Sequence, residues 1–209
     1  MRKSLYRLLA CFLVLTPLAC SAQPEAFVEG EHYREVRNVE SGDDGKIRVT
    51  EVFWYGCPHC YQFEPIIKEW SSATADDVVF EQLPTAFGRP SGRVHLKAFY
   101  AADELDVQQE VHSAIFNAIH EQGRRPSSEQ EMAGFFEQAG VAPEDFEKTF
   151  GSFTVENRVR RAEKRVSDFG VTSVPTVIVD GRWQVNAGAA GSYERLLEIV
   201  DFLINKARD

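Results

Sequence analysis

Two cysteines separated by two residues, in the run Cys57-Pro58-His59-Cys60, constrain this chain more than any other feature of its sequence. The preceding segment, residues 48–55, is β-branched and aromatic and is followed by a glycine, which is typical of a strand. From Pro58 onward the apolar residues recur at three- and four-residue spacing, as on the buried face of a helix. The cysteine pair is therefore predicted to lie where a strand gives way to a helix.

A helix start is a favourable place for a redox cysteine, because the nucleophilic form of cysteine is its thiolate. If Cys57 caps the helix and Pro58 takes its first turn, unpaired N–H groups and the positive end of the helix dipole face the Cys57 sulfur. His59 adds positive charge when it is protonated. Cys60 follows one turn later in a more buried position. We expect Cys57 to form the mixed disulfide, Cys60 to resolve it, and the stabilised thiolate to make the disulfide a better oxidant.

Other interpretations of the cysteine pair are weaker. A zinc site needs more ligands, and the sequence shows no second cysteine pair and no obvious histidine pair on one element. Haem attachment needs a histidine directly after the second cysteine, where Tyr61 stands. A purely structural disulfide would close too small a loop to stabilise the fold much. A zinc site and a structural disulfide stay as alternatives, and no metal or organic cofactor is predicted.

The first 22 residues have the pattern of an export signal. Three basic residues precede a short apolar stretch, residues 8–18, that ends in small residues. This stretch is shorter than the about 20 apolar residues needed to cross a bilayer. We expect cleavage after Ala22, and lipid attachment at Cys20 is the alternative.

Removing this signal changes both the charge and the cysteine count. Residues 1–22 contain three of the 23 basic residues and none of the 32 acidic ones, so the rest of the chain carries a net charge of −12. Such a balance argues against nucleic acid as a partner. Cys11 and Cys20 lie in the signal region, which leaves Cys57 and Cys60 as the only assured pair. Their use is therefore functional, and the fold relies on an ordinary hydrophobic core.

Strand and helix signals alternate in a way that indicates an α/β domain with a helical insertion at about residues 90–152. An Asp180-Gly181 hairpin turn is expected between the last two strands. Strands are predicted near residues 35–39, 48–55, 78–83, 174–179 and 183–185, and helices from residue 58, at 94–102, 107–119, after a capping box at 128–131, at 143–151, 154–168 and 192–206.

Several phenylalanines of the insertion have helical spacing. They could line a peptide groove, but aromatic residues at this spacing are usually core. We assign these residues to the core: Phe135, Phe136 and Phe146.

The run from Glu51 to Glu64, EVFWYGCPHCYQFE, closely resembles the active-site region of the DsbA family, the bacterial periplasmic disulfide oxidases. The resemblance extends over nearly the whole mature chain, residues 23–209. It implies a thioredoxin fold with an inserted α-helical domain and a periplasmic location. It also implies that Cys57 is the exposed nucleophile, that Cys60 is its resolving partner, and that Pro58-His59 sets the redox potential.

The same resemblance implies roles for residues outside the motif. Val174-Pro175 resembles the family's cis-proline step, which is expected to pair with a bound peptide, although most X-Pro bonds are trans. Glu51 stands in a hydrophobic strand, so it is either at an exposed edge or buried with a purpose. The resemblance to the family implies the second alternative, in which Glu51 is a buried acid that helps to move protons during thiol exchange. The lysine that some members pair with it is not evident in residues 78–83, where Glu81 is the only charged residue.

The function that follows is a monomeric oxidase that gives its disulfide to reduced, newly exported proteins. The resemblance implies reoxidation by a membrane partner of the DsbB type. A disulfide isomerase or reductase is the enzymatic alternative, but family isomerases carry an N-terminal dimerisation domain, and residues 23–44 are too few to form one. A peptide-binding chaperone with an incidental redox site is the alternative from another class.

Overall fold

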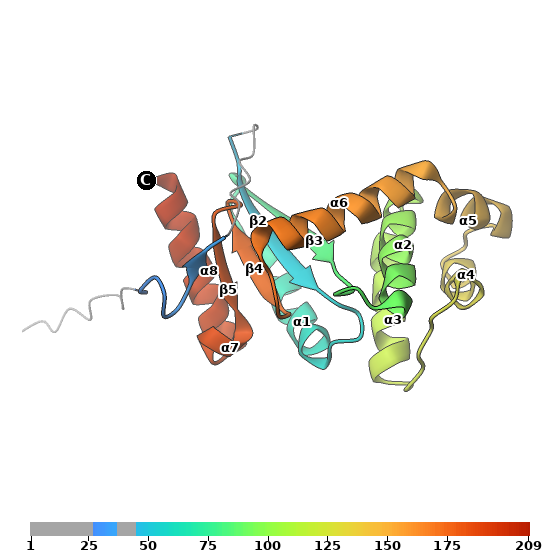
Figure 1. Cartoon of the computed structure of the whole chain (residues 1–209), viewed down its shortest axis with the longest axis horizontal. Coiled ribbons are helices and arrows are strands. Elements are labelled where there is room, and N and C mark those ends of the chain that lie inside the picture. The colour runs from blue at the N-terminus through green and yellow to red at the C-terminus, as the bar shows by residue number, and fades with distance from the viewer. Residues whose placement is uncertain (1–26, 37–44) are drawn as a thin grey trace, which may run out of the picture.

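The computed structural model describes residues 27–36 and 45–209, so the predicted export signal lies outside the described residues. A five-stranded sheet in the order β1-β5-β4-β2-β3 forms the centre of the molecule (Figure 1). Its strands are β1 (Arg34–Glu35), β2 (Ile47–Phe53), β3 (Val78–Pro84), β4 (Thr176–Val179) and β5 (Trp183–Asn186). The helices are α1 (Pro58–Ser72), α2 (Pro90–Glu104), α3 (Gln108–His120), α4 (Glu129–Gln138), α5 (Pro143–Phe150), α6 (Phe153–Phe169), α7 (Ala187–Ala190) and α8 (Tyr193–Arg208).

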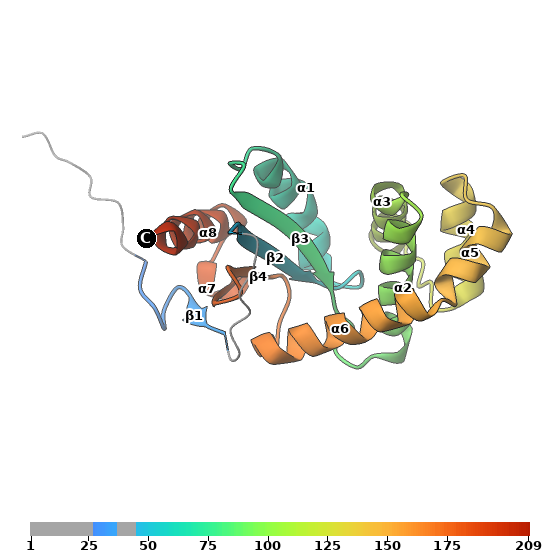
Figure 2. The ribbon, with the colours of Figure 1, turned by 90° about the horizontal axis from the view of Figure 1, so that it is seen from above.

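Strand β2 is the strand that positions the cysteine motif. It pairs in parallel with β3 on one side and antiparallel with β4 on the other. Helices α1 and α8 cover one face of the sheet, and α6 runs along the opposite face (Figure 2). Because both faces are covered, six of the seven β2 residues are buried, which explains its nearly continuous hydrophobic sequence.

The β4–β5 hairpin confirms the turn expected from the sequence. Asp180 and Gly181 connect the strands, and both have positive φ angles, of 53° and 59°. Two successive residues in this region make the turn whose twist matches that of the paired strands. On its other side β4 pairs with β2, so the segment that precedes β4 approaches the start of α1.

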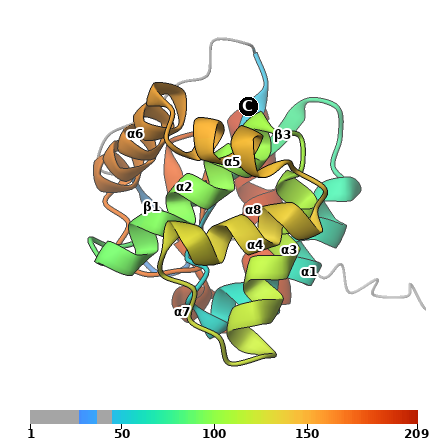
Figure 3. The same ribbon diagram turned by 90° about the vertical axis from the view of Figure 1, so that its right-hand side faces the viewer.

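Helices α2 to α5 form a separate layer beyond the end of the sheet, and α6 leads from this layer back across the sheet (Figure 1, Figure 3). The predicted fold, a thioredoxin fold with an inserted helical domain, is confirmed. The three phenylalanines assigned to the core are buried: Phe135, Phe136 and Phe146. The capping box is also present, because Ser128 and Glu131 bond reciprocally at the start of α4.

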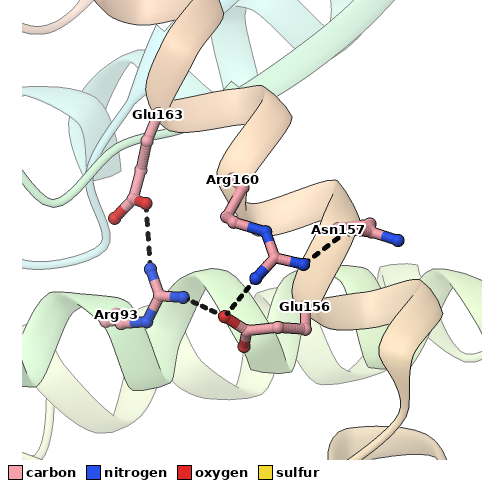
Figure 4. A network of polar contacts seen from close by, with 5 residues as sticks. All are labelled: Arg93, Glu156, Asn157, Arg160 and Glu163. Atoms are coloured by element: carbon pink, nitrogen blue, oxygen red, sulfur yellow. Dashed lines mark hydrogen bonds and ion pairs between the residues drawn. The ribbon is translucent and has the colours of Figure 1, made fainter.

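An ion-pair network joins α2 to α6 (Figure 4). Arg93 of α2 contacts Glu156 and lies 2.9 Å from Glu163, both on α6. Glu156 also lies 3.8 Å from Arg160, which donates a 2.6 Å hydrogen bond to Asn157. These side chains are partly exposed, so each pair contributes about 1 kcal/mol or less to stability. The network helps to hold α6 against α2.

Some element boundaries differ from the sequence prediction. Helix α2 begins at Pro90 instead of residue 94, because proline suits the first helical turn. Gly92 lies within this helix, and a glycine suits the position because a Cβ there would lie 2.4 Å from the Cβ of Ala86. Strand β4 begins at Thr176 instead of residue 174, and the short helix α7 is absent from the prediction. The first predicted strand is reduced to β1, and its end, residues 37–39, lies outside the described residues.

Candidate active site

The cysteine motif lies at the start of α1, as the sequence predicts. Cys57 is the N-cap residue, with extended backbone angles, and Pro58 follows in the first turn. A 2.9 Å hydrogen bond from the Cys57 N–H to the Trp54 carbonyl closes the turn between β2 and α1. Gly56 leaves room for the Trp54 ring, which lies 2.4 Å from where a Cβ would stand. The turn therefore directs the Cys57 side chain toward the free N–H groups of α1.

The two sulfurs differ in accessibility, although less than expected. Cys57 is 8% exposed and Cys60 is fully buried, and both are free thiols. The expectation of an exposed Cys57 is thus corrected: it is the more accessible of the two, but it is largely covered. The cover comes from the loop before β4, where the Val174 carbonyl oxygen lies 3.6 Å from the Cys57 sulfur.

The environment of the two thiols pushes their pKa values in opposite directions. A hydrogen bond from the Cys60 side chain lowers the pKa of Cys57 to about 6, with further help from the backbone N–H groups of Cys60 and His59. Burial raises the pKa of Cys60 far above its usual value, and the nearby Cys57 adds to this effect. Cys57 is therefore the thiolate of the reduced protein, and Cys60 stays protonated.

His59 has a smaller electrostatic role than the sequence suggested. Its side chain is exposed, and its charge lowers the pKa of Cys57 less than the Cys60 hydrogen bond does. Its backbone carbonyl accepts a 3.0 Å hydrogen bond from the Tyr193 hydroxyl, and the Tyr193 ring stacks on Phe63 of α1. Tyr193 is a site residue that sequence reasoning missed, because it lies 134 positions from His59.

The peptide bond between Val174 and Pro175 is cis, in agreement with the resemblance. Both residues line a pocket of about 450 Å³ beside the motif, together with His59 and Tyr193. The opposite wall is formed by the start of α7 and by the turn before α8. The structure thus brings the two expected substrate-binding residues next to the Cys57 sulfur.

Glu51 is fully buried, which excludes the exposed-edge alternative. It lies on the β2 face that α1 covers, and its direct neighbour on β3 is Gln82. The Gln82 amide donates a 2.9 Å hydrogen bond to Oε2 of Glu51. Strand β3 thus offers a neutral amide to Glu51 and contains no lysine to pair with it. Burial raises the pKa of Glu51 to about 8, and the charge of Glu64 adds to the shift. Glu51 is therefore mostly protonated at neutral pH.

Three further polar residues extend from Glu51 toward the inserted helices. The same Gln82 nitrogen donates a second 2.9 Å bond to Oε2 of Glu64 on α1. Oε1 of Glu64 lies 3.1 Å from Nε2 of His112 on α3, and Nδ1 of His112 shares a 2.8 Å hydrogen bond with the Tyr55 hydroxyl. Sequence reasoning missed Gln82, Glu64 and His112 as site residues. Glu64 could have been identified from the sequence, because it is the last residue of the run that resembles the DsbA family.

Within residues 27–36 and 45–209, no group of three or more His, Cys, Asp or Glu side chains is arranged to hold a metal ion. In the same part of the chain, no helix is long and apolar enough to cross a membrane. The side chains of the site supply a stabilised thiolate, a buried thiol and a buried acid.

A reactive cysteine at a helix start, a buried partner one turn later and a cis-proline loop beside them define a thiol-disulfide oxidoreductase of the thioredoxin fold. Comparison with known proteins narrows this class. A family model described as a DSBA-like thioredoxin domain matches residues 48–198. The thiol:disulfide interchange protein DsbA of Pseudomonas aeruginosa is 39% identical over 189 residues, which are 90% of this chain and 89% of that protein. The chain belongs to the DsbA family.

Solved structures of the family have the same fold. Oxidoreductase DsbA from Xylella fastidiosa is 34% identical, with a TM-score of 0.81, and the match covers 87% of this chain and 97% of that one. A DsbA from Proteus mirabilis, solved with a non-covalently bound peptide, is 26% identical, with a TM-score of 0.72 and coverage of 88% and 98%.

Proposed function

We propose that the protein works as an oxidase, which gives its Cys57–Cys60 disulfide to reduced polypeptides. The observation that carries this direction is the opposite shift of the two thiol pKa values. A stabilised Cys57 thiolate favours the reduced form of the protein, which makes the disulfide a stronger oxidant. It also makes Cys57 a good leaving group when the mixed disulfide is resolved by the substrate.

The proposed reaction has two exchange steps. A substrate thiolate attacks the Cys57 sulfur, a mixed disulfide forms, the Cys57–Cys60 bond breaks, and Cys60 leaves with the electron pair. A second substrate thiolate then attacks the substrate sulfur of the mixed disulfide. The substrate gains a disulfide, Cys57 leaves as a thiolate, and the two electrons of the oxidation stay on the protein's cysteines.

Glu51 is proposed to supply the proton that Cys60 takes when it leaves. Its charge would raise the pKa of Cys60, so the two groups interact. At neutral pH Glu51 holds a proton, and the thiol form of Cys60 is strongly favoured over its thiolate. Transfer from the acid to the sulfur is therefore downhill at the moment when the disulfide opens.

Val174 and Pro175 are proposed to bind the substrate backbone beside the Cys57 sulfur. The support is their position in the wall of the 450 Å³ pocket and the 3.6 Å approach of the Val174 carbonyl to that sulfur. The Proteus mirabilis relative binds a peptide non-covalently. Recognition through the backbone would suit substrates of varied sequence.

The remaining parts of the proposal concern location and partners. Residues 1–22 act as an export signal cleaved after Ala22, and residues 23–209 work as a monomer in the periplasm, with the helical insertion at about residues 90–152. The clients are newly exported proteins with reduced cysteines. A membrane protein of the DsbB type reoxidises the Cys57–Cys60 pair. The family membership of the chain supports these assignments.

The direct test is oxidation of a reduced, unfolded protein that contains several cysteines. Each oxidised chain should consume two substrate thiols and form one substrate disulfide. Cys57→Ser should be inactive, and Cys60→Ala should accumulate a mixed disulfide when offered a substrate that is already disulfide-bonded. Arg93→Gln, in the network of Figure 4, is a folded control that should keep full activity. If Cys57→Ser still promotes folding of the substrate as well as the native chain does, the protein is a chaperone and the oxidase proposal fails.

A further inference from the structure

His112 is a buried histidine of the inserted helical layer that the proposed reaction does not use. It is 4% exposed and lies on α3, where aromatic rings surround it. The centroids of Phe53, Tyr55 and Phe116 lie between 4.9 and 5.2 Å from its own. A polar ring in such surroundings is costly unless its nitrogens have partners. Both nitrogens of His112 do have close polar neighbours.

The two neighbours fix the imidazole in one orientation. The Tyr55 hydroxyl lies 2.8 Å from Nδ1, and this bond turns Nε2 toward α1. Oε1 of Glu64 then lies 3.1 Å from Nε2. The ring N–H does not point straight at that oxygen, so the contact is a close approach of two polar atoms and not an aligned hydrogen bond.

Glu64 is linked in turn to Glu51 by a single nitrogen. Nε2 of Gln82 donates 2.9 Å bonds to one oxygen of each carboxyl group. Two carboxyl groups that share a neutral bridge in a poorly hydrated site resist carrying two negative charges, so one negative charge and one proton are favoured. Which of the two carboxyl groups is ionised depends on what else contacts each of them.

The contacts are unequal. Oε1 of Glu51 is buried and has no hydrogen-bond partner among the described residues, whereas Oε1 of Glu64 faces His112. Glu64 also borders a pocket of about 620 Å³ that His112 and Gln82 line, so it is the better hydrated of the two. The pKa values follow this asymmetry: against the opposing effect of burial, His112 holds the pKa of Glu64 below its usual value, while burial raises that of Glu51 to about 8.

Other charged groups line the same pocket, and the main ones are paired with one another. Arg158 lies 2.6 Å from Asp103, and Arg165 lies 2.7 Å from Glu81. Lys68, one turn beyond Glu64 on α1, lowers the pKa of Glu64 less than His112 does. The charged residues that border this pocket besides Glu64 and His112 are Lys68, Glu81, Asp103, Arg158, Arg161 and Arg165.

We propose that His112 is a positioning residue for thiol-disulfide exchange: its contact with Glu64 keeps the negative charge on Glu64 and the proton on Glu51. The inserted helical layer thereby sets the protonation of Glu51 in the central sheet, through contacts that run from α3 to α1 and β3. This inference rests on the proposed function for its consequence, the supply of a proton to Cys60, but not for the location of the proton itself.

The test is a pH titration of the two carboxyl groups by carbon NMR in the reduced protein, with signals assigned through Glu51→Gln and Glu64→Gln. His112→Phe fills the aromatic site but removes both ring nitrogens. We expect the titration of Glu51 to move down and that of Glu64 to move up, each by about one pH unit or more. His112→Gln, which keeps an N–H donor, should lie between this variant and the native chain.

His95→Gln is the matched control. His95 is also buried, at 6% exposure, and its ring packs 5.7 Å from that of Tyr55, but its Nε2 contacts the Pro126 carbonyl instead of a carboxylate. The His95→Gln variant should therefore leave the titrations of Glu51 and Glu64 unchanged. Unchanged titrations in His112→Phe, or equal shifts in His95→Gln, would overturn the inference.

The kinetic consequence is read from the pH profile of disulfide opening by a small thiol. The rate should fall at alkaline pH, when Glu51 loses its proton. In His112→Phe this fall should move to lower pH, by the same number of pH units as the Glu51 titration. A carboxyl shift with an unmoved rate profile would show that the proposed proton donor is wrong while the charge placement holds. Absence of both shifts would show that His112 has only a packing role.

Discussion

The Cys57 sulfur lies 3.6 Å from the carbonyl oxygen of Val174, a residue 117 positions further along the chain. The start of α1 and the loop before β4 converge at this point because β2 and β4 are neighbours in the sheet. A peptide that pairs with the backbone of this loop would place one of its own sulfurs near Cys57. The relationship therefore joins substrate binding to the reacting atom.

Replacement of His59 by alanine should raise the pKa of Cys57. The positive charge of His59 is one of the influences that lower that pKa to about 6, although not the largest. We expect a rise of up to about one pH unit, because the side chain is exposed and its charge is screened. Titration of the thiolate by ultraviolet absorbance measures the change. An unchanged or lower pKa in His59→Ala would exclude a role for the histidine charge.

The reduced protein should resist denaturant better than the oxidised protein at pH 7, because a stabilised Cys57 thiolate favours the reduced fold. The pKa of Cys57 is lowered in the fold, so this stabilisation is fully present above the pKa of the unfolded thiol, near 9, and is lost as the pH falls through about 6. Parallel unfolding curves at pH 7 and pH 5 test this. An advantage of the reduced form that is absent at pH 7, or that grows toward pH 5, would contradict the account.

Glu51→Gln should stabilise the reduced protein at pH 8 and change it little at pH 4. Glu51 is fully buried, and its pKa is raised from 4.5 to about 8, so the native chain loses stability as the pH rises between these values. Glutamine has a similar shape and no charge to bury. The difference in unfolding free energy should reach a few kcal/mol, about 1.4 for each unit of pKa shift at most. Equal stabilities across this pH range would mean that Glu51 ionises without penalty.

Much of the site could be predicted because its signals are local. The Cys57-Pro58-His59-Cys60 run carries its own helix start, and the alternation of strand and helix patterns around it is that of an α/β domain. The Asp180-Gly181 turn likewise predicts the hairpin that pairs β4 with β5. The start of α2 at Pro90 differs from the predicted residue 94, because the close approach of Ala86 to Gly92 leaves no mark in the spacing of apolar residues.

The site residues that the sequence does not reveal are placed by contacts between elements that lie far apart along the chain. Gln82 is a polar residue in a strand, and nothing in its neighbourhood along the sequence shows that it faces Glu51 and Glu64 together. His112 has the spacing of a core residue on an amphipathic helix, which it also is. The carboxylate that it contacts lies on another helix, 48 positions earlier, and only the packing of α3 against α1 brings them together.

The redox potential of the Cys57–Cys60 pair tests the central claim most directly. The protein is equilibrated in glutathione buffers of graded composition, and the fluorescence of Trp54, in the turn that leads to Cys57, reports the fraction reduced. Quantification of free thiols after acid quenching provides a second readout. A disulfide donor should have a potential well above that of a cytosolic thioredoxin, which is about −270 mV. A potential at or below that value would make the protein a reductase and contradict the account.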